Sequence, residues 1–307
     1  MGMLRTNFSN VAFDQPNERS LHSIPTPRVG GIAIFVVLIP LLFVASFPLL
    51  AVLAAILGTL SFLDDRHNLA VGLRFISHAI VAVTFAWLAL PQLTWLPMLG
   101  AIFFLTWMMN LFNFMDGSDG LAGGMAVIGF GAYGAAAWLG QNESLSIAAL
   151  CVCGCAAGFL YFNFPPAKVF MGDVGSIPLG FLAGAMGLYG WYKALWPMWF
   201  PALVFSPFIV DATITLLRRF LGGEKIWQAH RSHYYQRLIR AGWSHRKTAL
   251  ASYVLMILCG VSGLISVSSS FTRQDVVLPL FALLYMVLAC LIDRAWSQHI
   301  KNNAENL

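Results

Sequence analysis

Long runs of apolar residues alternate with short polar segments along almost the whole chain of 307 residues. A helix needs about 20 mostly apolar residues to cross the roughly 30 Å hydrocarbon layer of a bilayer. We expect the bounds of such helices to be accurate to about three residues. The predicted transmembrane helices are 31–47, 48–63, 74–90, 96–114, 118–139, 145–163, 176–192, 198–218, 248–268 and 276–294. The pattern therefore predicts an all-α fold class, a polytopic transmembrane bundle of about ten helices.

The nearly unbroken apolar stretch 31–63 can be divided in two ways. Pro48 favours a turn between two short helices, since proline lacks a backbone N–H and is well suited to the start of a helix. A single tilted helix is the alternative. Because Lys and Arg collect on the cytoplasmic side of membrane proteins, their distribution distinguishes the two.

With two helices in this stretch, six polar segments share one side: 1–30, 64–73, 115–117, 164–175, 219–247 and 295–307. Counted with adjacent helix ends, that side holds all but two of the 18 Lys and Arg residues, the exceptions being Lys193 and Arg273. One long helix would move the segment 1–30 across the membrane and spoil this asymmetry. We therefore predict two helices and a cytoplasmic location for both termini.

The acidic residues, which play no part in that assignment, are sorted the same way. All but two of the 13 Asp and Glu residues, Glu143 and Asp275, fall on the predicted cytoplasmic side. Ionisable side chains are costly in a bilayer and commonly mark functional sites. Their shared location predicts one catalytic cleft on the cytoplasmic face.

Composition agrees with the membrane class. The chain is 59% hydrophobic and 10% charged, with a mean hydropathy of +0.74, whereas soluble domains carry about 25% charged residues. The net charge of +5 is modest, and we expect no nucleic-acid partner. Residues 1–307 are predicted to form one integral membrane domain, with 219–247 as a cytoplasmic loop within it.

The five cysteines lie inside apolar runs, so no disulfide framework is implied. The spacing of Cys151, Cys153 and Cys155 would suit a metal, but no His or acidic residue is near them. Small apolar residues packed in a helix are the better interpretation. Residues 1–30 also lack the apolar stretch of a cleavable signal peptide.

Two adjacent acids stand in the stretch "SFLDDRHNL", at a predicted helix end. Asp64 and Asp65 repel each other, and a divalent metal, a nearby cation or proton transfer would explain their pairing. A solvated helix end is the simpler alternative. Arg74 follows at the start of the next helix, where it could bind a phosphate or anchor the helix at the interface.

The stretch "NLFNFMDGSDGLAGG" places amides and acids at helical spacing. Asn110, Asn113 and Asp116 are three residues apart and share one helix face, and Asp119 continues the spacing if the turn is tight. The glycines allow close backbone approach, and a helix N-terminus there could hold phosphate. Polar contact between helices is the alternative to a site.

The stretch "NFPPAKVFMGDVGSIPLG" ends one helix and begins the next. Asp173, between glycines, is a plausible metal ligand because Mg²⁺ needs only one or two carboxylates besides substrate phosphates. Phe170 could stack on a nucleotide base, and Lys168 adds a cation. Asp211 is an isolated acid inside a predicted helix, either a site residue or a buried partner for a cation.

The loop stretch "HRSHYYQRL" carries His230, Arg231, His233 and Arg237. The His-x-x-His spacing is typical of zinc sites, but no Cys is near and the loop is rich in arginine. Arginine suits phosphate better than zinc, so binding of a diphosphate or nucleotide is favoured. A basic loop that contacts anionic lipid is the alternative.

Together these stretches resemble the polyprenyl-phosphate N-acetylhexosamine-1-phosphate transferase superfamily, that is, glycosyltransferase family 4 of the type that initiates glycans on undecaprenyl phosphate. The motifs, in order, are "DDRHNL", "NLFNFMDGSDGLAGG", "FPPAKVFMGDVGS" and "HRSHYYQRL". The upstream "DQPNERSLHSIPTPRVGG" is similar to the first cytoplasmic segment of the family. The resemblance spans roughly residues 14–240, and the last motif looks most like the branch that starts O-antigen and related surface glycans.

The resemblance implies transfer of a sugar 1-phosphate from a UDP-sugar to undecaprenyl phosphate, with release of UMP and a requirement for Mg²⁺ or Mn²⁺. It implies a multi-pass protein of the bacterial inner membrane with the lipid bilayer as its environment, and it leaves a homodimer open. The donor, such as an N-acetylglucosamine or a deoxy relative of it, is not specified. A covalent aspartyl intermediate is an open alternative to direct transfer.

The resemblance also implies a role for each residue that matches a motif of the family. Asp173 would bind the metal on the nucleotide diphosphate. Asp64 would activate or position the lipid phosphate, and Asp65 would support the metal or phosphates. The remaining roles are these: Asn113, Asp116 and Asp119 in the nucleotide and metal pocket, Phe170 near the uracil, and His230 and His233 on the diphosphate or sugar.

Two departures from the family pattern and two rival functions complete the picture. Relatives usually carry one more transmembrane helix before the "DQPNER" segment, so we expect a helix to be missing here. Arg74 stands where some relatives have lysine, which keeps a cation for phosphate.

CDP-alcohol phosphotransferases are disfavoured because "DGSDGLAGG" lacks the arginine of their motif. A transporter or flippase of lipid-linked sugars would place its ionisable residues near the midplane instead.

Overall fold

The computed structural model describes residues 13–14, 25–67, 69–225, 228, 230–268 and 274–305. Its helices are α2 (Gly30–Val44), α3 (Pro48–His67), α4 (Val71–Ala89), α5 (Trp95–Phe114), α6 (Leu121–Leu139), α7 (Glu143–Asn163), α8 (Asp173–Tyr192), α9 (Trp199–Val204), α10 (Ser206–Leu221), α11 (Tyr234–Arg240), α12 (His245–Ser268) and α13 (Gln274–Glu305). A two-residue antiparallel ladder pairs β1 (Phe13–Asp14) with β2 (Thr26–Pro27). Eight of these helices are long and apolar enough to cross a membrane, which confirms the predicted all-α membrane bundle.

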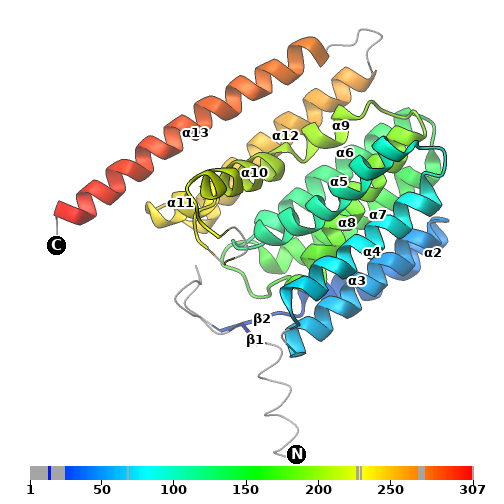
Figure 1. Ribbon diagram of the computed structural model, residues 1–307, viewed down its shortest axis with the longest axis horizontal. Helices are drawn as coiled ribbons and strands as arrows, with labels where there is room; N and C mark the ends of the chain where they lie inside the picture. The colour runs from blue at the N-terminus through cyan, green and yellow to red at the C-terminus, as the bar shows by residue number, and fades with distance from the viewer. Residues whose placement is uncertain are drawn as a thin grey trace, which may run out of the picture.

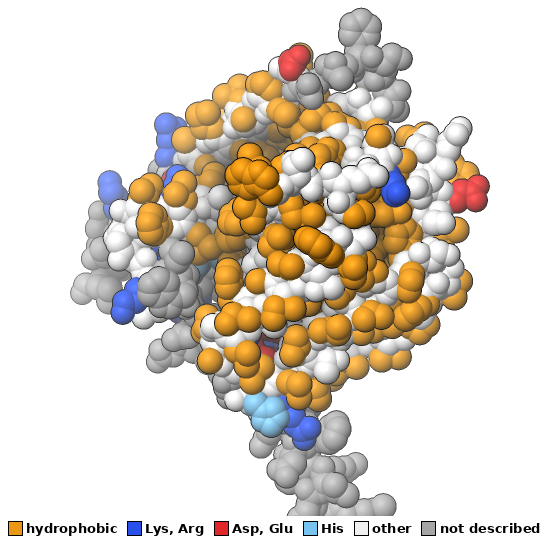
Figure 2. Space-filling model, turned by 45° about the vertical axis from the view of Figure 1, so that its right-hand side comes forward, with side chains coloured by type: hydrophobic (Ala, Val, Ile, Leu, Met, Phe, Trp, Pro, Cys, Tyr) orange, Lys and Arg blue, Asp and Glu red, His pale blue; other side chains and the backbone are white. Residues whose placement is uncertain are grey.

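The long helices lie side by side, and α13 runs along one edge of the bundle (Figure 1). Helix α8 is central: it contacts α3 and α5 extensively, and α2, α6 and α9 as well. In the most apolar 18-residue stretch of α8, 89% of the residues are buried, against 6% in the corresponding stretch of α13. Hydrophobic side chains cover most of the face drawn in Figure 2, as expected for a surface in contact with lipid.

The division of the stretch 31–63 into two helices is confirmed. Helix α2 ends at Val44, and α3 begins at Pro48. The reversal between them has Ser46 in the left-handed region, with φ of 67°. The N–H of Phe47 donates to the carbonyl of Leu42 at 2.8 Å, which caps the end of α2.

The single helix predicted over 198–218 is wrong, because the chain breaks there into α9 and α10 at Phe205. Pro207 has no N–H to continue the ladder toward the carbonyl of Leu203. The hydroxyl of Ser206 donates to that carbonyl instead, at 2.6 Å. The break is therefore stabilised by a side chain that replaces the missing backbone donor.

The polar ends of the last helices were also predicted too short. Helix α13 continues from Gln274 to Glu305, well beyond the predicted end at 294. Its 32 residues span about 48 Å at 1.5 Å per residue, so it extends beyond the hydrocarbon layer. The loop 219–247 likewise contains α11, besides the last turn of α10 and the first residues of α12.

Helices α2 and α8 approach closely at paired glycines. A Cβ on Gly31 would overlap the backbone nitrogen of Gly175, and a Cβ on Gly175 would lie 2.8 Å from the Gly31 Cα. Only glycine at both positions permits this distance between the two backbones. The contact lies next to the first turn of α8, where Asp173 stands.

Candidate active site

Four connections meet at one end of the bundle, here called the polar end. They join α3 to α4, α5 to α6, α7 to α8, and α10 to α12 through α11. Because consecutive helices run in opposite directions, each of these connections returns to the same end. The motifs singled out in the sequence lie in these connections or in the adjoining helix turns, as the predicted sidedness requires.

Asp64 joins the end of α3 to the start of α4. Its side chain is buried, and its Oδ1 accepts the N–H of Leu69 at 2.8 Å. Its Oδ2 accepts from Nη1 of Arg74 at 2.9 Å in an ion pair. Both carboxylate oxygens are therefore engaged in fixing the α3–α4 corner and the Arg74 guanidinium.

Asp65, Asp116 and Asp173 form an acidic cluster from three different connections. The Asp65 and Asp116 carboxylates each interact electrostatically with Asp173 and with Arg28. Burial and the nearby Asp173 raise the pKa of Asp116 well above its usual range, and Arg28 opposes this shift. The Asn113 side chain forms a hydrogen bond with the Asp173 carboxylate. The structure thus brings Asn113, Asp116 and Asp173 together, as the sequence predicted.

The backbone around Asp173 is held by the start of α2. The N–H of Phe170 donates to the carbonyl of Pro27 at 2.8 Å, and the N–H groups of Gly30 and Gly31 donate to Phe170 and Met171 at 3.0 Å. Gly172 then turns with φ of 69°, a conformation that suits glycine. Asp173 is therefore placed by a backbone frame rather than by a flexible loop, and Phe170 lies partly buried within it.

Asp119 does not continue the stripe of α5, because that helix ends at Phe114 and the chain turns before α6. Its Oδ2 accepts the N–H of Ala167 at 3.0 Å, and its Oδ1 lies 3.6 Å from Nδ1 of His245. The sequence placed Asn110, Asn113 and Asp116 on one helix face, with Asp119 continuing the spacing if the turn is tight. Because α5 ends at Phe114, this prediction is wrong for Asp116 and for Asp119, which both lie beyond the helix. The Asp119 side chain links the α5–α6 turn to the α7–α8 turn.

The His-x-x-His segment is organised by Asp211 of α10. The buried Asp211 carboxylate accepts the N–H groups of Tyr234 and Tyr235 at 2.9 and 3.1 Å, which caps the start of α11 from another helix. Nδ1 of His233 lies 3.2 Å from the same carboxylate. Asp211 is therefore a buried acceptor for the backbone and the His233 ring of the histidine segment.

The two histidine rings lie next to each other, with centroids 4.8 Å apart. His233 is buried and also stacks on Phe114 at the end of α5. His230 is partly buried, and its Nδ1 lies 2.8 Å from the hydroxyl of Ser232. Burial, with His233 and Arg219 nearby, lowers the pKa of His230 to about 4. His230 is therefore neutral at physiological pH.

Tyr235 connects the histidine segment to the acidic cluster. Its hydroxyl donates to the carbonyl of Phe114 at 3.1 Å, and Gly117 leaves room for the ring beneath the α5–α6 turn. The electrostatic interaction of Tyr235 with both Asp116 and Asp211 places it between the two. The loop motif thus lies beside the acids, although residues 117 and 235 are far apart in sequence.

The remaining predicted cations lie in different surroundings. Arg237 forms an ion pair with Asp293 of α13 at 2.8 Å, so it faces the last helix. Arg231 is partly buried and accepts at its carbonyl from Arg240 at 3.0 Å. Lys168 has an exposed side chain, and its N–H donates to the carbonyl of Phe162.

The sequence did not single out three residues that the geometry brings into this region: Arg28, Tyr235 and His245. Arg28 precedes α2 and interacts with all three acids of the cluster. A cation directly before the first membrane helix, in "PTPRVGG", was the available signal. His245 lies 3.1 Å from the Ser118 hydroxyl, a contact between distant segments that no local pattern announces.

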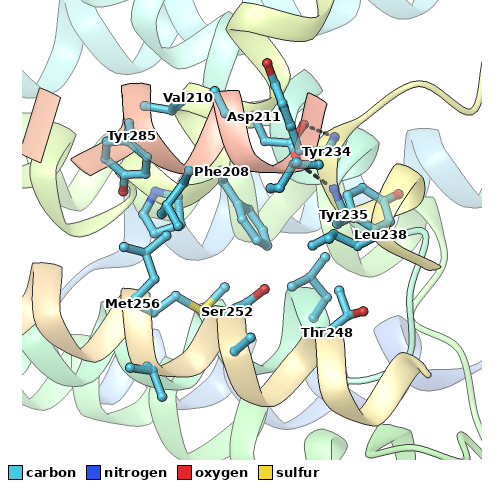
Figure 3. Close-up of a pocket in the computed structure, with 18 of the residues that line it drawn as sticks. Phe208, Val210, Asp211, Tyr234, Tyr235, Leu238, Thr248, Ser252, Met256 and Tyr285 are labelled. Atoms are coloured by element: carbon cyan, nitrogen blue, oxygen red, sulfur yellow. Dashed lines mark hydrogen bonds between the residues drawn. The ribbon is translucent and has the colours of Figure 1, made fainter. Parts of the chain in front are cut away.

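An apolar pocket lies beside the histidine segment, between α10, α11, α12 and α13 (Figure 3). Its volume is about 500 Å³. Phe208, Leu238, Met256 and Tyr285 line it, and the Asp211 carboxylate with its bonds to Tyr234 and Tyr235 borders one side. The pocket therefore borders the histidine segment and has a mostly apolar lining.

The donor set suits a hard divalent cation. Carboxylate and amide oxygens are the ligands that Mg²⁺ and Mn²⁺ prefer, and Asp116 and Asp173 stand close enough to repel each other. Within the described ranges, no group of three or more His, Cys, Asp and Glu side chains forms a preassembled metal site. Asp116 and Asp173 are the two carboxylates that could hold such a cation, because Mg²⁺ needs only one or two besides phosphates and water.

The fold and the site define a multi-pass membrane protein whose polar end suits phosphate chemistry. The family model of glycosyl transferase family 4 matches residues 47–190. A relative from Bacillus subtilis (strain 168), named as a probable undecaprenyl-phosphate N-acetylglucosaminyl 1-phosphate transferase, is 30% identical over 280 residues, covering 84% of this chain and 78% of the relative.

Relatives from other bacteria agree. Undecaprenyl-phosphate alpha-N-acetylglucosaminyl 1-phosphate transferases of Escherichia coli (strain K12) and Yersinia pestis are each 29% identical, over 92% of this chain and 84% of the relative. The chain therefore belongs to glycosyl transferase family 4, within the polyprenyl-phosphate N-acetylhexosamine-1-phosphate transferase superfamily. It is a membrane transferase.

Proposed function

We propose that this protein transfers a sugar 1-phosphate of the N-acetylhexosamine type from a UDP-sugar to undecaprenyl phosphate. The products are a lipid-linked diphosphosugar and UMP, and the reaction initiates O-antigen or a related surface polysaccharide. One observation carries the proposal: the acidic cluster of Asp65, Asp116 and Asp173 lies beside the His-x-x-His segment at one end of a membrane bundle. The names of the relatives support one part of it, the transfer of a sugar 1-phosphate to undecaprenyl phosphate.

Transfer of a phosphoryl group between two polyanions depends mainly on positioning and neutralisation of charge. In this proposal Asp173 and Asp116 hold Mg²⁺ or Mn²⁺, which neutralises charge on the diphosphate when bound. Asp65 supports the metal or the phosphates from the end of α3. Asn113 orients Asp173, and His230, as a neutral ring, bonds the diphosphate or sugar.

The acceptor needs little help from a base. A phosphate monoester is largely dianionic near neutral pH, since its second pKa is about 6. Both oxygens of Asp64 are already engaged by Leu69 and Arg74, so we assign Asp64 the positioning of Arg74. Among the described residues, the buried Nε of Arg74 has no hydrogen-bond partner, which supports this guanidinium as a ligand for the lipid phosphate.

We propose that the polar end faces the cytoplasm in the bacterial inner membrane. The asymmetry of Lys and Arg supports this orientation, and Lys193 lies at the opposite end after α8. The same arrangement disfavours a flippase. Transporters bind substrate near the bilayer midplane on broken helices, whereas the ionisable cluster of this protein lies where helices end.

The test uses membranes that contain this chain, undecaprenyl phosphate, Mg²⁺ and a panel of UDP-N-acetylhexosamines. The wild-type protein is expected to release UMP and form a lipid diphosphosugar with at least one donor, and Asp173→Asn is expected to abolish both. Omission of the divalent cation should do the same. Release of UDP would mean a glycosyltransferase of another kind, and transport of a lipid-linked sugar without any UMP would favour the flippase.

A further inference from the structure

Helix α13 touches the rest of the protein at two separate places, on either side of the apolar pocket. At the far end from the polar site, Phe281 packs with Leu203 and Cys259, and the hydroxyl of Tyr285 lies 2.6 Å from that of Ser206. At the polar end Asp293 forms ion pairs, and the Arg240 guanidinium lies over the ring of Trp296, 4.7 Å from its centroid. Between the two contacts the helix lines the pocket.

Asp293 binds two arginines from two different elements. Arg218 of α10 donates from Nη1 to both carboxylate oxygens, at 2.9 and 2.7 Å. Arg237 of α11 donates from its Nη1 to Oδ1 at 2.8 Å. Both guanidinium groups also lie over the ring of Tyr234, at 5.4 and 5.3 Å from its centroid. One acid from α13 thus joins α10 and α11 across an aromatic ring.

Arg237 continues this link into the histidine segment. Its Nε donates to the carbonyl of Ser232 at 2.8 Å, directly between His230 and His233. The guanidinium therefore has one edge on the backbone of the segment and the other on Asp293. Removal of the Asp293 charge would leave both arginines beside Tyr234 without the carboxylate that bridges them, and their repulsion would weaken the bond of Arg237 to Ser232.

We propose that Asp293 is a positioning residue for the transferase reaction: through Arg237, it holds the His230–His233 segment in place beside the acidic cluster. This inference rests on the proposed function and reassigns Arg237 from the substrate phosphate to a structural link. An isolated exposed ion pair has little effect on stability. Here the Arg237 side chain is only 16% exposed and Asp293 31%, and the carboxylate is shared by two guanidinium groups.

The experiment compares Asp293→Asn, Asp293→Glu and Asp275→Asn in the full chain reconstituted in nanodiscs. Asp275 is the matched control, an acid on the same helix at its opposite end. For Asp293→Asn we expect the KM for the UDP-sugar to rise about tenfold, the factor that corresponds to roughly 1.4 kcal/mol. The kcat should change much less, because the reacting groups are intact. Asp293→Glu should restore most of the affinity, and Asp275→Asn should match the wild type.

A second readout does not need catalysis. Hydrogen exchange of the peptide 230–240 should quicken in Asp293→Asn and stay at the wild-type rate in Asp275→Asn, because the ionic link between α11 and α13 is lost only in the first. The double variant Asp293→Asn with Arg237→Gln should be no worse than Arg237→Gln alone, since both act through one contact. If the two effects multiply instead, Arg237 contacts substrate directly and the inference is overturned.

The outcomes separate this inference from the proposed function. A wild-type protein that forms no UMP with any donor would refute the function, while the exchange data would still decide whether Asp293 orders the segment. Unchanged exchange together with an unchanged KM in Asp293→Asn would overturn the inference and leave the function standing. A fall in kcat alone would also overturn it, because loss of positioning should appear in KM.

Discussion

The cap that Asp211 places on α11 supplies a quantitative prediction. Replacing Asp211 by Ala removes the acceptor for the N–H groups of Tyr234 and Tyr235 and the partner of His233. A hydrogen bond to a charged group is worth about 1.5–3 kcal/mol, so the two backbone bonds alone amount to roughly 3–6 kcal/mol. Because the whole protein is only marginally stable, a loss of this size is large enough to detach α11 from α10.

Two milder variants calibrate the effect. Asp211→Asn keeps one acceptor oxygen and loses one charge-assisted bond, so it should cost about half as much, roughly 1.5–3 kcal/mol. Thr215→Val removes only the hydroxyl that donates to Asp211 at 3.2 Å. This distance exceeds the usual 2.5–3.0 Å of an O–H···O bond, so the expected cost is only about 0.5–1.5 kcal/mol. The predicted order of destabilisation is therefore Ala, then Asn, then the Thr215 variant.

The assay combines thermal unfolding of the protein in detergent with the KM for the UDP-sugar. Asp211→Ala should lower the midpoint most and raise KM most, with membrane expression measured as a control for insertion. If Asp211→Ala unfolds and binds donor like the wild type, the capping argument is refuted. If Asp211→Asn and Thr215→Val are equal, the charge of Asp211 carries none of the effect.

Three further predictions concern other parts of the polar end. Gly31→Ala should destabilise by about 1–3 kcal/mol and lower activity by pushing α2 from α8, whereas Gly158→Ala, which faces open space, should be neutral in the same melt. Asn163→Ala, by leaving the Gly120 N–H without its 2.8 Å acceptor, should cost about 1–3 kcal/mol in unfolding. Because the pKa of His230 is lowered to about 4, the folded protein leaves this ring neutral while the unfolded chain protonates it near pH 6.5. Stability should therefore fall as pH drops from about 6.5 toward 4, and fall less in His230→Gln; equal slopes would contradict the shift.

Hydropathy predicted most of the helices, because each helix that crosses the bilayer needs a run of about 20 mostly apolar residues and such runs are easily recognised. The turn at Pro48 also followed from local chemistry and from charge sidedness. The break at Phe205 did not, since apolar residues continue on both sides of it and the decisive contact is a single hydroxyl. The extent of α13 was missed because polar residues beyond a membrane boundary carry no signal for where a helix ends.

The candidate site was predictable in its members and less so in its connections. Asp116 and Asp173 meet because short connections return each helix pair to the same end. The contacts Asp211–His233 and Arg237–Asp293 join residues 22 and 56 positions apart, and only the packing of α10, α11 and α13 brings them together. Residue type alone therefore suggested phosphate binding for Arg237, whereas the geometry gives it an internal partner.

The enclosure of α8 has a consequence for how the protein responds to its membrane. Bilayers differ in thickness, and mismatched lipid tilts or bends the helices that it touches. Helix α13 lies at the periphery, so a change in bilayer thickness acts on it directly. Helix α8 is surrounded by other helices, which would have to tilt or bend before it does. Asp173, at the start of α8, is therefore shielded from changes in bilayer thickness. The histidine segment, by contrast, is linked through Arg237 and Asp293 to α13, the helix that the lipid contacts.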